Sequence, residues 1–286
     1  MRTNCRSLRL SLGAACLLLT TLASAQTFTT IDFPGGFGTQ PTAVNASGII
    51  VGRYSDATNH SHGFVLAAGK YVAVDVPNAT DTELNWINPS GQIVGDYTTA
   101  DGKTHAFVLD AGKFTFFDYP GAFDTRAWGI SPSGNIVGTH SEAPGTTHGY
   151  LRTKQGALTA IDFPGMSVTF ASMLNEKSVV GFYVDSTPSA HAYLFSDGNY
   201  QPVSCPGWDG LVLTSLNPQG DMTGGGFRLA DGRPHGVVVS NGKCTAVDYP
   251  GSVGADYVNS MNPRGDLVGT YATPDFQGHG YLRTKR

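Results

Sequence analysis

The chain contains 286 residues with 18 basic and 22 acidic side chains, a formal net charge of −4. This acidic balance disfavours sequence-independent nucleic-acid binding, which requires cations that neutralise phosphates, and we expect no nucleic-acid partner. The 37 glycines and 16 prolines separate short runs rich in valine, isoleucine, threonine, tyrosine and phenylalanine, a composition typical of β-structure.

The first 25 residues have the pattern of a secretory signal peptide. Three arginines precede an apolar run from Leu10 to Leu22, and Ala23-Ser24-Ala25 supplies the small-x-small pattern that a signal peptidase recognises. A lipoprotein signal around Cys16 is an alternative, although the expected leucine is missing before this cysteine. We expect cleavage after Ala25 and a secreted or periplasmic protein with 15 basic and 22 acidic residues, a net charge of −7. No other segment approaches the roughly 18 apolar residues that a membrane span needs.

Three short markers then recur six times each, about every 43 residues. An Asp-x-Pro tripeptide begins at Asp32, Asp75, Asp118, Asp162 and Asp248, with Ser204-Cys205-Pro206 in the remaining place. A His-Gly or His-Ala dipeptide begins at His62, His105, His148, His191, His235 and His279. A turn followed by an apolar pair ends at Gly52, Gly95, Gly138, Gly181, Gly224 and Gly269. Such a period indicates a repeat architecture, and we expect one domain over residues 26–286.

Each repeat is predicted to form four short strands, named a to d in chain order. In the second copy, strand a covers Leu84–Asn88, strand b runs from Gln92 to about Tyr97, strand c begins at His105 and strand d ends at Asp118. Asn-Pro-x-Gly sequences join a to b, and two-residue turns such as Ala111-Gly112 join c to d. Four antiparallel strands in 40 to 45 residues correspond to one blade of a β-propeller.

The two ends of the chain predict how the blades close into a ring. Phe28–Phe33 matches a lone d strand, and His279–Arg283 matches a c strand with no d strand after it. Pairing these segments would complete the last blade and leave no unpaired sheet edge. We therefore predict an all-β, six-bladed β-propeller with four-stranded blades, closed by its N-terminal strand. A linear solenoid or a pair of β-sandwiches is the alternative.

The motifs resemble a known repeat. His105-Ala106-Phe107, its variants in the other copies, and the Asn-Pro-Ser-Gly-x-Ile-Val-Gly and Asp-Tyr-Pro-Gly segments are similar to the HAF-type extracellular repeat of bacterial secreted proteins. The resemblance covers all of residues 26–286. It implies export and a repeat β-fold, and it implies no particular reaction. The fourth copy departs from the pattern, because its turn Asn175-Glu176-Lys177-Ser178 is shorter and lacks proline and glycine.

Six of the eight histidines occupy one repeat position, which predicts a structural role rather than a metal site or catalysis. Across a two-residue c–d turn, this histidine faces the aspartate of Asp-x-Pro on the same side of the sheet. The expected pairs are His62–Asp75, His105–Asp118, His148–Asp162, His235–Asp248 and, through ring closure, His279–Asp32. His191 instead faces Ser204. His60 and His140 lie outside this register in predicted b–c loops, where we expect them to be solvated.

Residues 26–286 contain two cysteines, Cys205 and Cys244. Export would permit a disulfide between them. However, Cys205 falls at the end of one d strand and Cys244 near the start of the next, so we expect them to be roughly 15–20 Å apart. The Cα atoms of a disulfide lie within about 7 Å of each other. The sequence therefore predicts two free thiols.

Binding residues are expected on one face of the ring. In a propeller the d–a and b–c connections share one face, here called the loop face, and the a–b and c–d turns share the other, the turn face. The loop face carries nearly all the sequence variation, and binding residues concentrate on such loops. The candidates on this face and at the channel mouth are Phe37, Glu83, Trp86, Phe123, Arg126, Trp128, Trp208, Asp209 and Asp256. Alternatively, the tryptophans pack between blades and the charges serve solubility.

Two classes of function fit this face. The first is an exported, monomeric binding module for a glycan, peptide or protein, without chemistry. The second is a propeller-type hydrolase or lyase with a divalent cation in the channel, for which Glu83, Asn85 and Asp256 are the candidate ligands. We favour the first class, because the chain contains no Gly-x-Ser-x-Gly, His-Glu-x-x-His, EF-hand or P-loop motif. The sequence identifies neither the ligand nor a cofactor.

Overall fold

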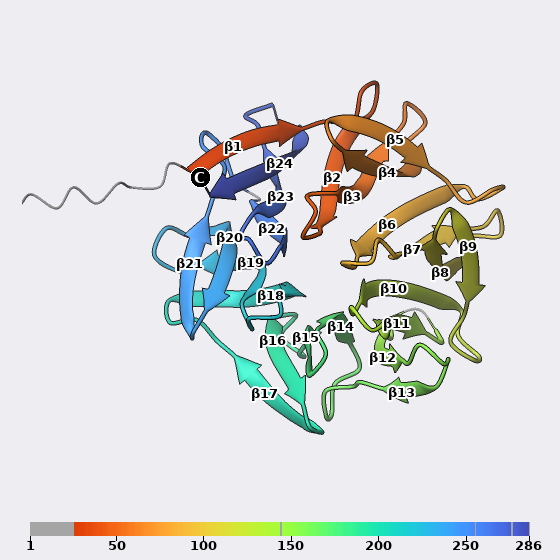
Figure 1. Cartoon of the computed structure of the whole chain (residues 1–286). Coiled ribbons are helices and arrows are strands. Elements are labelled where there is room, and N and C mark those ends of the chain that lie inside the picture. The colour runs from red at the N-terminus through yellow and green to blue at the C-terminus, as the bar shows by residue number, and fades with distance from the viewer. Residues whose placement is uncertain (1–25, 144, 255, 276, 286) are drawn as a thin grey trace, which may run out of the picture.

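The computed structural model describes residues 26–143, 145–254, 256–275 and 277–285. These residues form twenty-four strands in six antiparallel, four-stranded sheets that surround a central channel (Figure 1). The predicted six-bladed β-propeller is therefore confirmed, and the solenoid and the sandwiches are excluded. The predicted signal peptide, residues 1–25, lies outside the described residues. No helix within the described ranges has the length and apolarity to cross a membrane.

Each blade uses its strands in chain order from the innermost, a, to the outermost, d. The first three blades consist of β2 (Phe37–Val44), β3 (Ile50–Ser55), β4 (Ser61–Ala67) and β5 (Lys70–Val74); β6 (Asp81–Ile87), β7 (Ile93–Thr98), β8 (Thr104–Asp110) and β9 (Lys113–Phe117); and β10 (Asp124–Ile130), β11 (Ile136–Ser141), β12 (His148–Arg152) and β13 (Leu158–Ala160). The last three consist of β14 (Thr169–Leu174), β15 (Ser178–Val184), β16 (Ala190–Ser196) and β17 (Asn199–Val203); β18 (Trp208–Leu216), β19 (Met222–Arg228), β20 (Arg233–Ser240) and β21 (Lys243–Val247); and β22 (Tyr257–Met261), β23 (Leu267–Ala272), β24 (Gly278–Lys285) and β1 (Gln26–Ile31).

The first strand, β1, closes the ring by pairing antiparallel with the last strand, β24. In this ladder Gln26 faces Lys285 and Ile31 faces Gly280. The sixth blade thus takes three strands from the C-terminal end of the chain and its outermost strand from the N-terminal end. The predicted closure is confirmed, and all six sheets have four strands.

In five of the six His-Ala-Phe-like motifs, an aromatic residue packs beneath the glycine that ends the third marker; the fifth copy has Val237 instead. In the second blade, a Cβ atom on Gly95 would overlap both the carbonyl oxygen of Glu83 and the ring of Phe107, which is fully buried. In the third blade Tyr150 replaces the phenylalanine, and its hydroxyl donates to the Arg126 carbonyl at 2.9 Å. Because only glycine permits so close an approach, the glycine and the aromatic residue recur together.

The histidine of the same motif binds the aspartate of Asp-x-Pro on the neighbouring d strand. The distances from Nδ1 to the nearest carboxylate oxygen are 3.0 Å for His62–Asp75, 3.0 Å for His105–Asp118, 3.3 Å for His148–Asp162, 2.8 Å for His235–Asp248 and 3.0 Å for His279–Asp32. His191 binds Asp185 of its own b–c loop through Nε2 at 2.8 Å. These histidines therefore have partners within their blades and form no shared site.

Stacked rings join neighbouring blades. The middle residue of Asp-x-Pro in one blade stacks on a ring in strand b of the next blade, as Phe33 does on Tyr54, with ring centroids 3.7 Å apart. The same arrangement occurs in Tyr119–His140 (3.6 Å), Phe163–Tyr183 (3.9 Å) and Tyr249–Tyr271 (3.7 Å). Such pairs contribute about 0.5–1.5 kcal/mol each beyond their buried area. His140 belongs to this set and is only 5% exposed, which corrects the expectation of a solvated loop residue.

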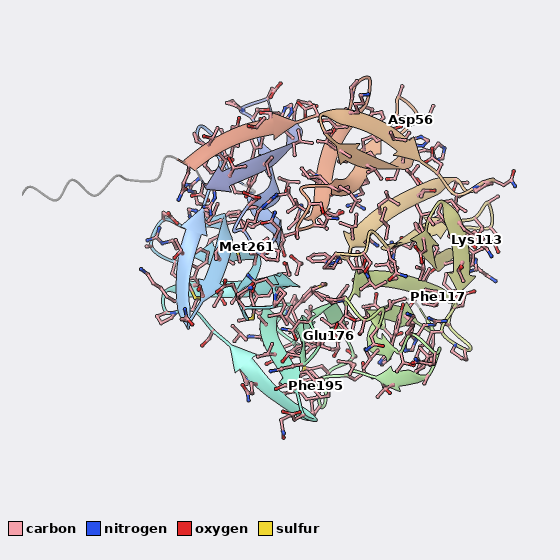
Figure 2. All side chains as sticks on the ribbon, in the orientation of Figure 1. Asp56, Lys113, Phe117, Glu176, Phe195 and Met261 are labelled. Carbon is pink, nitrogen blue, oxygen red and sulfur yellow. A yellow bond between two sulfur atoms is a disulfide. The ribbon has the colours of Figure 1, made fainter. Side chains whose placement is uncertain are left out.

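The a–b turns of adjacent blades hydrogen-bond to each other on the turn face. The side-chain amide of Asn88 donates to the carbonyl of Ser131 in the next blade at 3.1 Å. In the fourth blade, which lacks the Pro and Gly of the usual turn, the carboxylate of Glu176 accepts the backbone amide of Ser133 at 2.9 Å (labelled in Figure 2). The turn face is therefore tied together from blade to blade.

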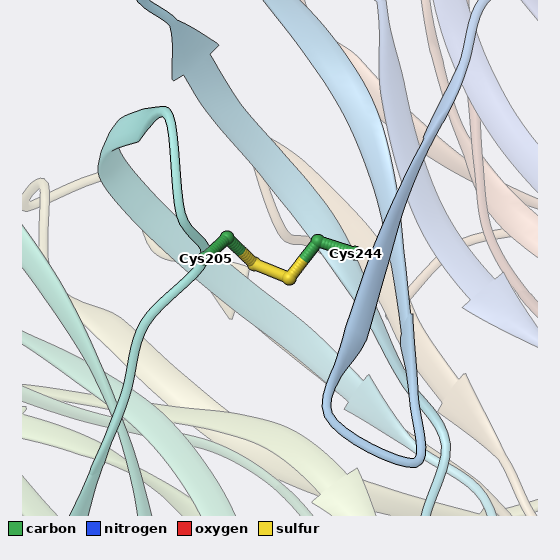
Figure 3. Close-up of a disulfide and its surroundings, with 2 residues drawn as sticks. All are labelled: Cys205 and Cys244. Atoms are coloured by element: carbon green, nitrogen blue, oxygen red, sulfur yellow. A yellow bond between two sulfur atoms is a disulfide. The ribbon is translucent and has the colours of Figure 1, made fainter.

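Cys205 and Cys244 form a disulfide, with their Cα atoms 5.9 Å apart (Figure 3). The prediction of two free thiols is wrong, because the expected separation of the two cysteines was a length along one strand and left out the twist of the sheets. Neighbouring strands rotate by about 20–25°, so the outermost strands lie along the circumference of the ring (Figure 1). The start of β21 is thereby brought beside the link that follows β17.

The two positions joined by the disulfide are also in contact in other blades, where both are aromatic. The ring centroids of Phe33 and Tyr71 are 5.6 Å apart, and those of Phe163 and Tyr200 are 5.3 Å apart. The disulfide replaces such an aromatic pair at the boundary between the fourth and fifth blades. Matched aromatic residues at these two repeat positions were therefore the sequence signal for this contact.

Candidate binding site at the channel mouth

Each innermost strand has a β-bulge at the same repeat position, where its pairing with strand b shifts register. A bulge leaves one residue unpaired and redirects its side chain. The bulge residues form one ring around the channel: Thr42, Asn85, Trp128, Ser172, Thr214 and Asn259. A second ring, two residues earlier in each strand, consists of Gln40, Glu83, Arg126, Phe170, Val212 and Tyr257.

The two rings enclose a cavity of about 320 Å³ at the loop-face end of the channel. All their members except Arg126 line it, together with Arg53, Trp86 and Phe182. Trp86 also lines a smaller cavity of about 60 Å³ toward the turn face, so its indole forms the floor between the two spaces. Side chains of all six blades surround this axis in Figure 2. The larger cavity lies at the low end of the range of about 300–1,000 Å³ for small-molecule sites.

The wall contributed by the first two blades is polar. The guanidinium of Arg53 in β3 binds the carboxylate of Glu83 in β6 and also donates to the Gln40 Oε1 atom from Nε at 3.1 Å and Nη2 at 2.9 Å. The Glu83 side chain is 15% exposed. Charge-assisted bonds from a planar guanidinium hold their partners in a defined orientation. The three side chains therefore present a preorganised set of donors and acceptors.

A buried carboxylate, Asp96 in β7, supports this wall from behind. Its Oδ1 accepts from Asn85 Nδ2 at 2.7 Å, and its Oδ2 accepts from Arg126 Nη1 at 2.8 Å. The Asp96 side chain is 2% exposed, and this burial raises its pKa to about 7, although Arg126 acts in the opposite direction. Asp96 does not line the cavity, so its role is to position Asn85 and Arg126.

The wall contributed by the third to sixth blades is aromatic. Phe170 in β14 stacks on Phe182 in β15, with ring centroids 4.4 Å apart and an interplanar angle of 10°. Tyr257 in β22 lines the cavity with its ring, while its hydroxyl donates to the Val212 carbonyl at 3.1 Å. Trp128 completes this wall next to Phe170. Ser172, Thr214 and Asn259 line the same side, so it offers ring surfaces together with short polar side chains.

Hydrogen-bonding groups therefore face aromatic rings across one small cavity. Such a lining suits an uncharged ligand that has hydroxyl groups on one side and an apolar surface on the other. No three His, Cys, Asp or Glu side chains of the described residues gather in a way that could hold a metal ion.

Comparisons with known proteins identify the architecture. No family model and no curated protein sequence matches the chain. Among solved structures, TolB from Acinetobacter baumannii matches with a TM-score of 0.52 and 12% identity, covering 87% of this chain and 55% of that one. The lectin of Aleuria aurantia, solved with Fucα1-6GlcNAc, matches at 0.56 and 11%, covering 87% and 93%. A gluconolactonase from Xanthomonas campestris matches at 0.57 and 13%, covering 89% and 88%. These likenesses show the fold alone.

The predicted site residues fall into two groups. Glu83, Trp86 and Trp128 line the channel cavity, and Arg126 belongs to the same ring. Phe37, Phe123, Trp208, Asp209 and Asp256 do not line it. Phe37, the first residue of β2, and Phe123, in the d–a segment before β10, are exposed, at 44% and 49%.

Asp256 has a structural position instead. Its Oδ1 accepts the backbone amide of Tyr249 at 3.0 Å, and the residue is 1% exposed. The equivalent amide in four other blades is accepted by the hydroxyl of Thr39, Thr82, Thr125 or Thr169. Burial raises the pKa of the Asp256 carboxyl. The candidate cation set of Glu83, Asn85 and Asp256 is therefore not brought together.

Trp208 packs against residues of its own blade, the fifth. Four other blades have tyrosine two residues after the glycine that ends the third marker, whereas the fifth has Gly226. A Cβ atom on Gly226 would lie 3.1 Å from the Trp208 ring, and this ring meets His235 edge to face with centroids 5.9 Å apart. The indole therefore occupies space that a tyrosine fills elsewhere.

Several cavity residues were not predicted. They are Gln40, Thr42, Arg53, Phe170, Ser172, Phe182, Val212, Thr214, Tyr257 and Asn259. Their sequence signal was the repeat register: Gln40, Phe170 and Tyr257 occupy the same position in strand a as Glu83 and Arg126. Aligning the six copies at this position would have identified a ring that is polar in three consecutive blades and apolar in the other three.

Proposed function

We propose that the chain is an exported β-propeller binding module, and that the channel mouth on its loop face holds a saccharide unit. The observation that carries this proposal is the two-sided cavity of about 320 Å³, with Arg53 and Glu83 on one wall and Phe170 and Phe182 on the other.

The two walls match the two kinds of surface on a sugar ring. The C–H face of a pyranose is apolar and packs on aromatic rings, whose burial supplies most of the binding energy. Sugar hydroxyls both donate and accept, so they can bond to the Glu83 carboxylate, the Arg53 guanidinium and the Asn85 amide. Because these groups are held by one another and by Asp96, little ordering cost remains on binding.

The likeness to a lectin solved with a disaccharide supports the proposal only at the level of the fold, since 11% of residues are identical. The likeness to a gluconolactonase keeps a second candidate open, a propeller-type hydrolase or lyase with a divalent cation in the channel. That candidate has less support, because Glu83 is bound by Arg53 and Asp256 is buried outside the cavity.

The test begins with a glycan array probed with the labelled protein, residues 26–286, followed by calorimetric titration of the glycans that bind. Glu83→Gln removes the carboxylate of the polar wall, and Phe170→Ala removes a ring of the aromatic wall. Each should weaken binding about tenfold or more, a loss of about 1.4 kcal/mol. Phe123→Ala, an exposed phenylalanine outside the cavity, is the matched control and should bind as the unaltered protein does.

Array-wide absence of binding, or binding that survives both substitutions, would contradict the proposed function. Incubating each bound glycan with the protein and calcium, then searching for cleavage products by mass spectrometry, tests the enzyme candidate. Export is tested separately: secretion of the full chain should yield a protein that begins at Gln26.

A further inference from the structure

A second cavity, of about 290 Å³, lies between the third and fourth blades beside the channel mouth. Trp128 and Phe170 line both this side cavity and the channel cavity, so the two spaces share an aromatic wall. The other residues that matter here are Arg126, Thr139, His140 and Thr147, which also line the side cavity.

The side cavity is open because a small residue stands at this blade boundary. In strand b, the residue directly after the glycine that ends the third marker projects toward the next blade. At the first two boundaries it is Arg53 or Asp96, and each binds a charged partner across the boundary. At the third boundary it is Thr139, whose hydroxyl accepts the Trp128 Nε1 hydrogen at 2.9 Å. This bond fixes the indole, and the short threonine leaves the adjoining space unfilled.

His140 lines this cavity at a position where the chain departs from the repeat. The same position is tyrosine in four other blades, namely Tyr54, Tyr97, Tyr183 and Tyr271. The imidazole is 5% exposed, and its Nδ1 atom has no hydrogen-bond partner among the described residues. The ring stacks on Tyr119 of the second blade, so it bounds the cavity without presenting this nitrogen to it. Burial lowers the pKa of His140.

Arg126 offers hydrogen-bond donors to the same cavity. Its Nη1 is bound by Asp96 at 2.8 Å, while its Nη2 lies 3.5 Å from Thr104 Oγ1, at the limit of a hydrogen bond. The side chain is 36% exposed. Because a guanidinium has five N–H donors, several remain for a ligand.

We propose that the side cavity is a second subsite, which holds the next unit of a saccharide whose first unit occupies the channel mouth. The ligand class is then an oligosaccharide of at least two units, with Trp128 and Phe170 contacting both. The inference rests on the proposed function and makes it more specific, because a single sugar would leave the side cavity without an occupant.

Calorimetric titration with three glycan series tests this: glucose, cellobiose and cellotriose; glucose, maltose and maltotriose; and N-acetylglucosamine with its β1-4 dimer and trimer. In the series that binds, the disaccharide should bind about tenfold or more tightly than the monosaccharide, because the second unit makes contacts of its own. The trisaccharide should add less than this.

Two variants connect the gain to the side cavity. His140→Tyr restores the residue that four other blades carry, so folding should be preserved, and it places a larger side chain at the cavity lining. Thr147→Phe fills the cavity from its rim. Both should abolish most of the tenfold gain and leave monosaccharide affinity within about twofold. Ala190→Phe, the equivalent position in the fourth blade, is the matched control and should retain the gain.

Equal affinity for one, two and three units, or a gain that both variants retain, would overturn the second subsite while leaving the channel site intact. Failure of every sugar in the three series to bind would instead contradict the proposed function, and this inference with it.

Discussion

The carboxylate of Asp32 lies 3.0 Å from Nδ1 of His279, although 247 residues separate the two in sequence. The same geometry joins His62 to Asp75 across a hairpin within one blade, also at 3.0 Å. The closure of the ring therefore uses the same local interaction as an ordinary c–d hairpin, with β1 supplied by the opposite end of the chain. No special contact is needed at the seam.

Deleting Gln26–Ile31 should destabilise the whole ring. The deletion would expose an unpaired edge on β24 and remove Ile31, which is 3% exposed. We expect a loss of about 4 kcal/mol or more, seen as a melting temperature lower by roughly 10 °C. Adding a synthetic peptide of residues 26–33 should recover part of this loss by pairing with the open edge. An unchanged melting temperature after the deletion would show that β1 does not close the ring.

The disulfide makes a direct chemical prediction. Protein of residues 26–286, unfolded without a reductant, should not react with iodoacetamide, and after reduction it should gain two alkyl groups. Replacing Cys205 and Cys244 together with serine should lower the free energy of unfolding by about 2–4 kcal/mol, because the closed loop restricts the unfolded chain. Reduced, unaltered protein is the matched control and should be destabilised similarly. Alkylation of both thiols before reduction would refute the bond.

Asp96 should make stability depend on pH. Its pKa is raised to about 7 by burial in the folded protein, against about 3.9 in an unfolded chain. The folded state therefore binds the proton more tightly, and this stabilisation is complete below about pH 4 and is lost as the pH rises through about 7.

Asp96→Asn keeps the shape and removes the titrating group, so the decline in unfolding free energy between about pH 4 and 7 should become shallower. Urea unfolding at several pH values measures this slope. If the variant and the unaltered protein show the same slope, the Asp96 carboxyl does not titrate in this window.

Trp208 should matter for stability and not for ligand binding. Trp208→Ala is expected to cost about 1–3 kcal/mol, less than for a fully buried tryptophan, because the ring is only partly buried. Gly226→Tyr alone should also destabilise, since a Cβ atom there already lies 3.1 Å from the indole. In the Trp208→Ala background the same Gly226→Tyr change should restore stability. Additive losses of stability in the double variant would show that the indole and a tyrosine at position 226 do not occupy the same space. Weaker glycan binding by Trp208→Ala would show that Trp208 takes part in binding.

Much of the fold was predictable from the repeat because its interactions are local. His105 and Asp118 face each other across a two-residue turn, so their spacing alone indicates the register of that hairpin. Six copies repeat this information, and the incomplete first and last copies predict the closure. The site was only partly predictable. Glu83, Trp86 and Trp128 were selected by their place on strand a, whereas Phe37 and Asp209 were selected by loop variation and lie elsewhere.

The sequence by itself determined the number of blades, the order of their strands and the pairing of β1 with β24, since these follow from the number of copies, the hairpins within each copy and the incomplete first and last copies. Only the tertiary structure decided that Cys205 meets Cys244, that Trp208 fills the space beside Gly226, and that Arg53 reaches Glu83. Sheet twist and neighbouring blades produce the disulfide and the Arg53 contact, and a strand distortion places the bulge residues in the channel. The channel mouth is a product of that geometry, because each blade contributes only a few side chains to it.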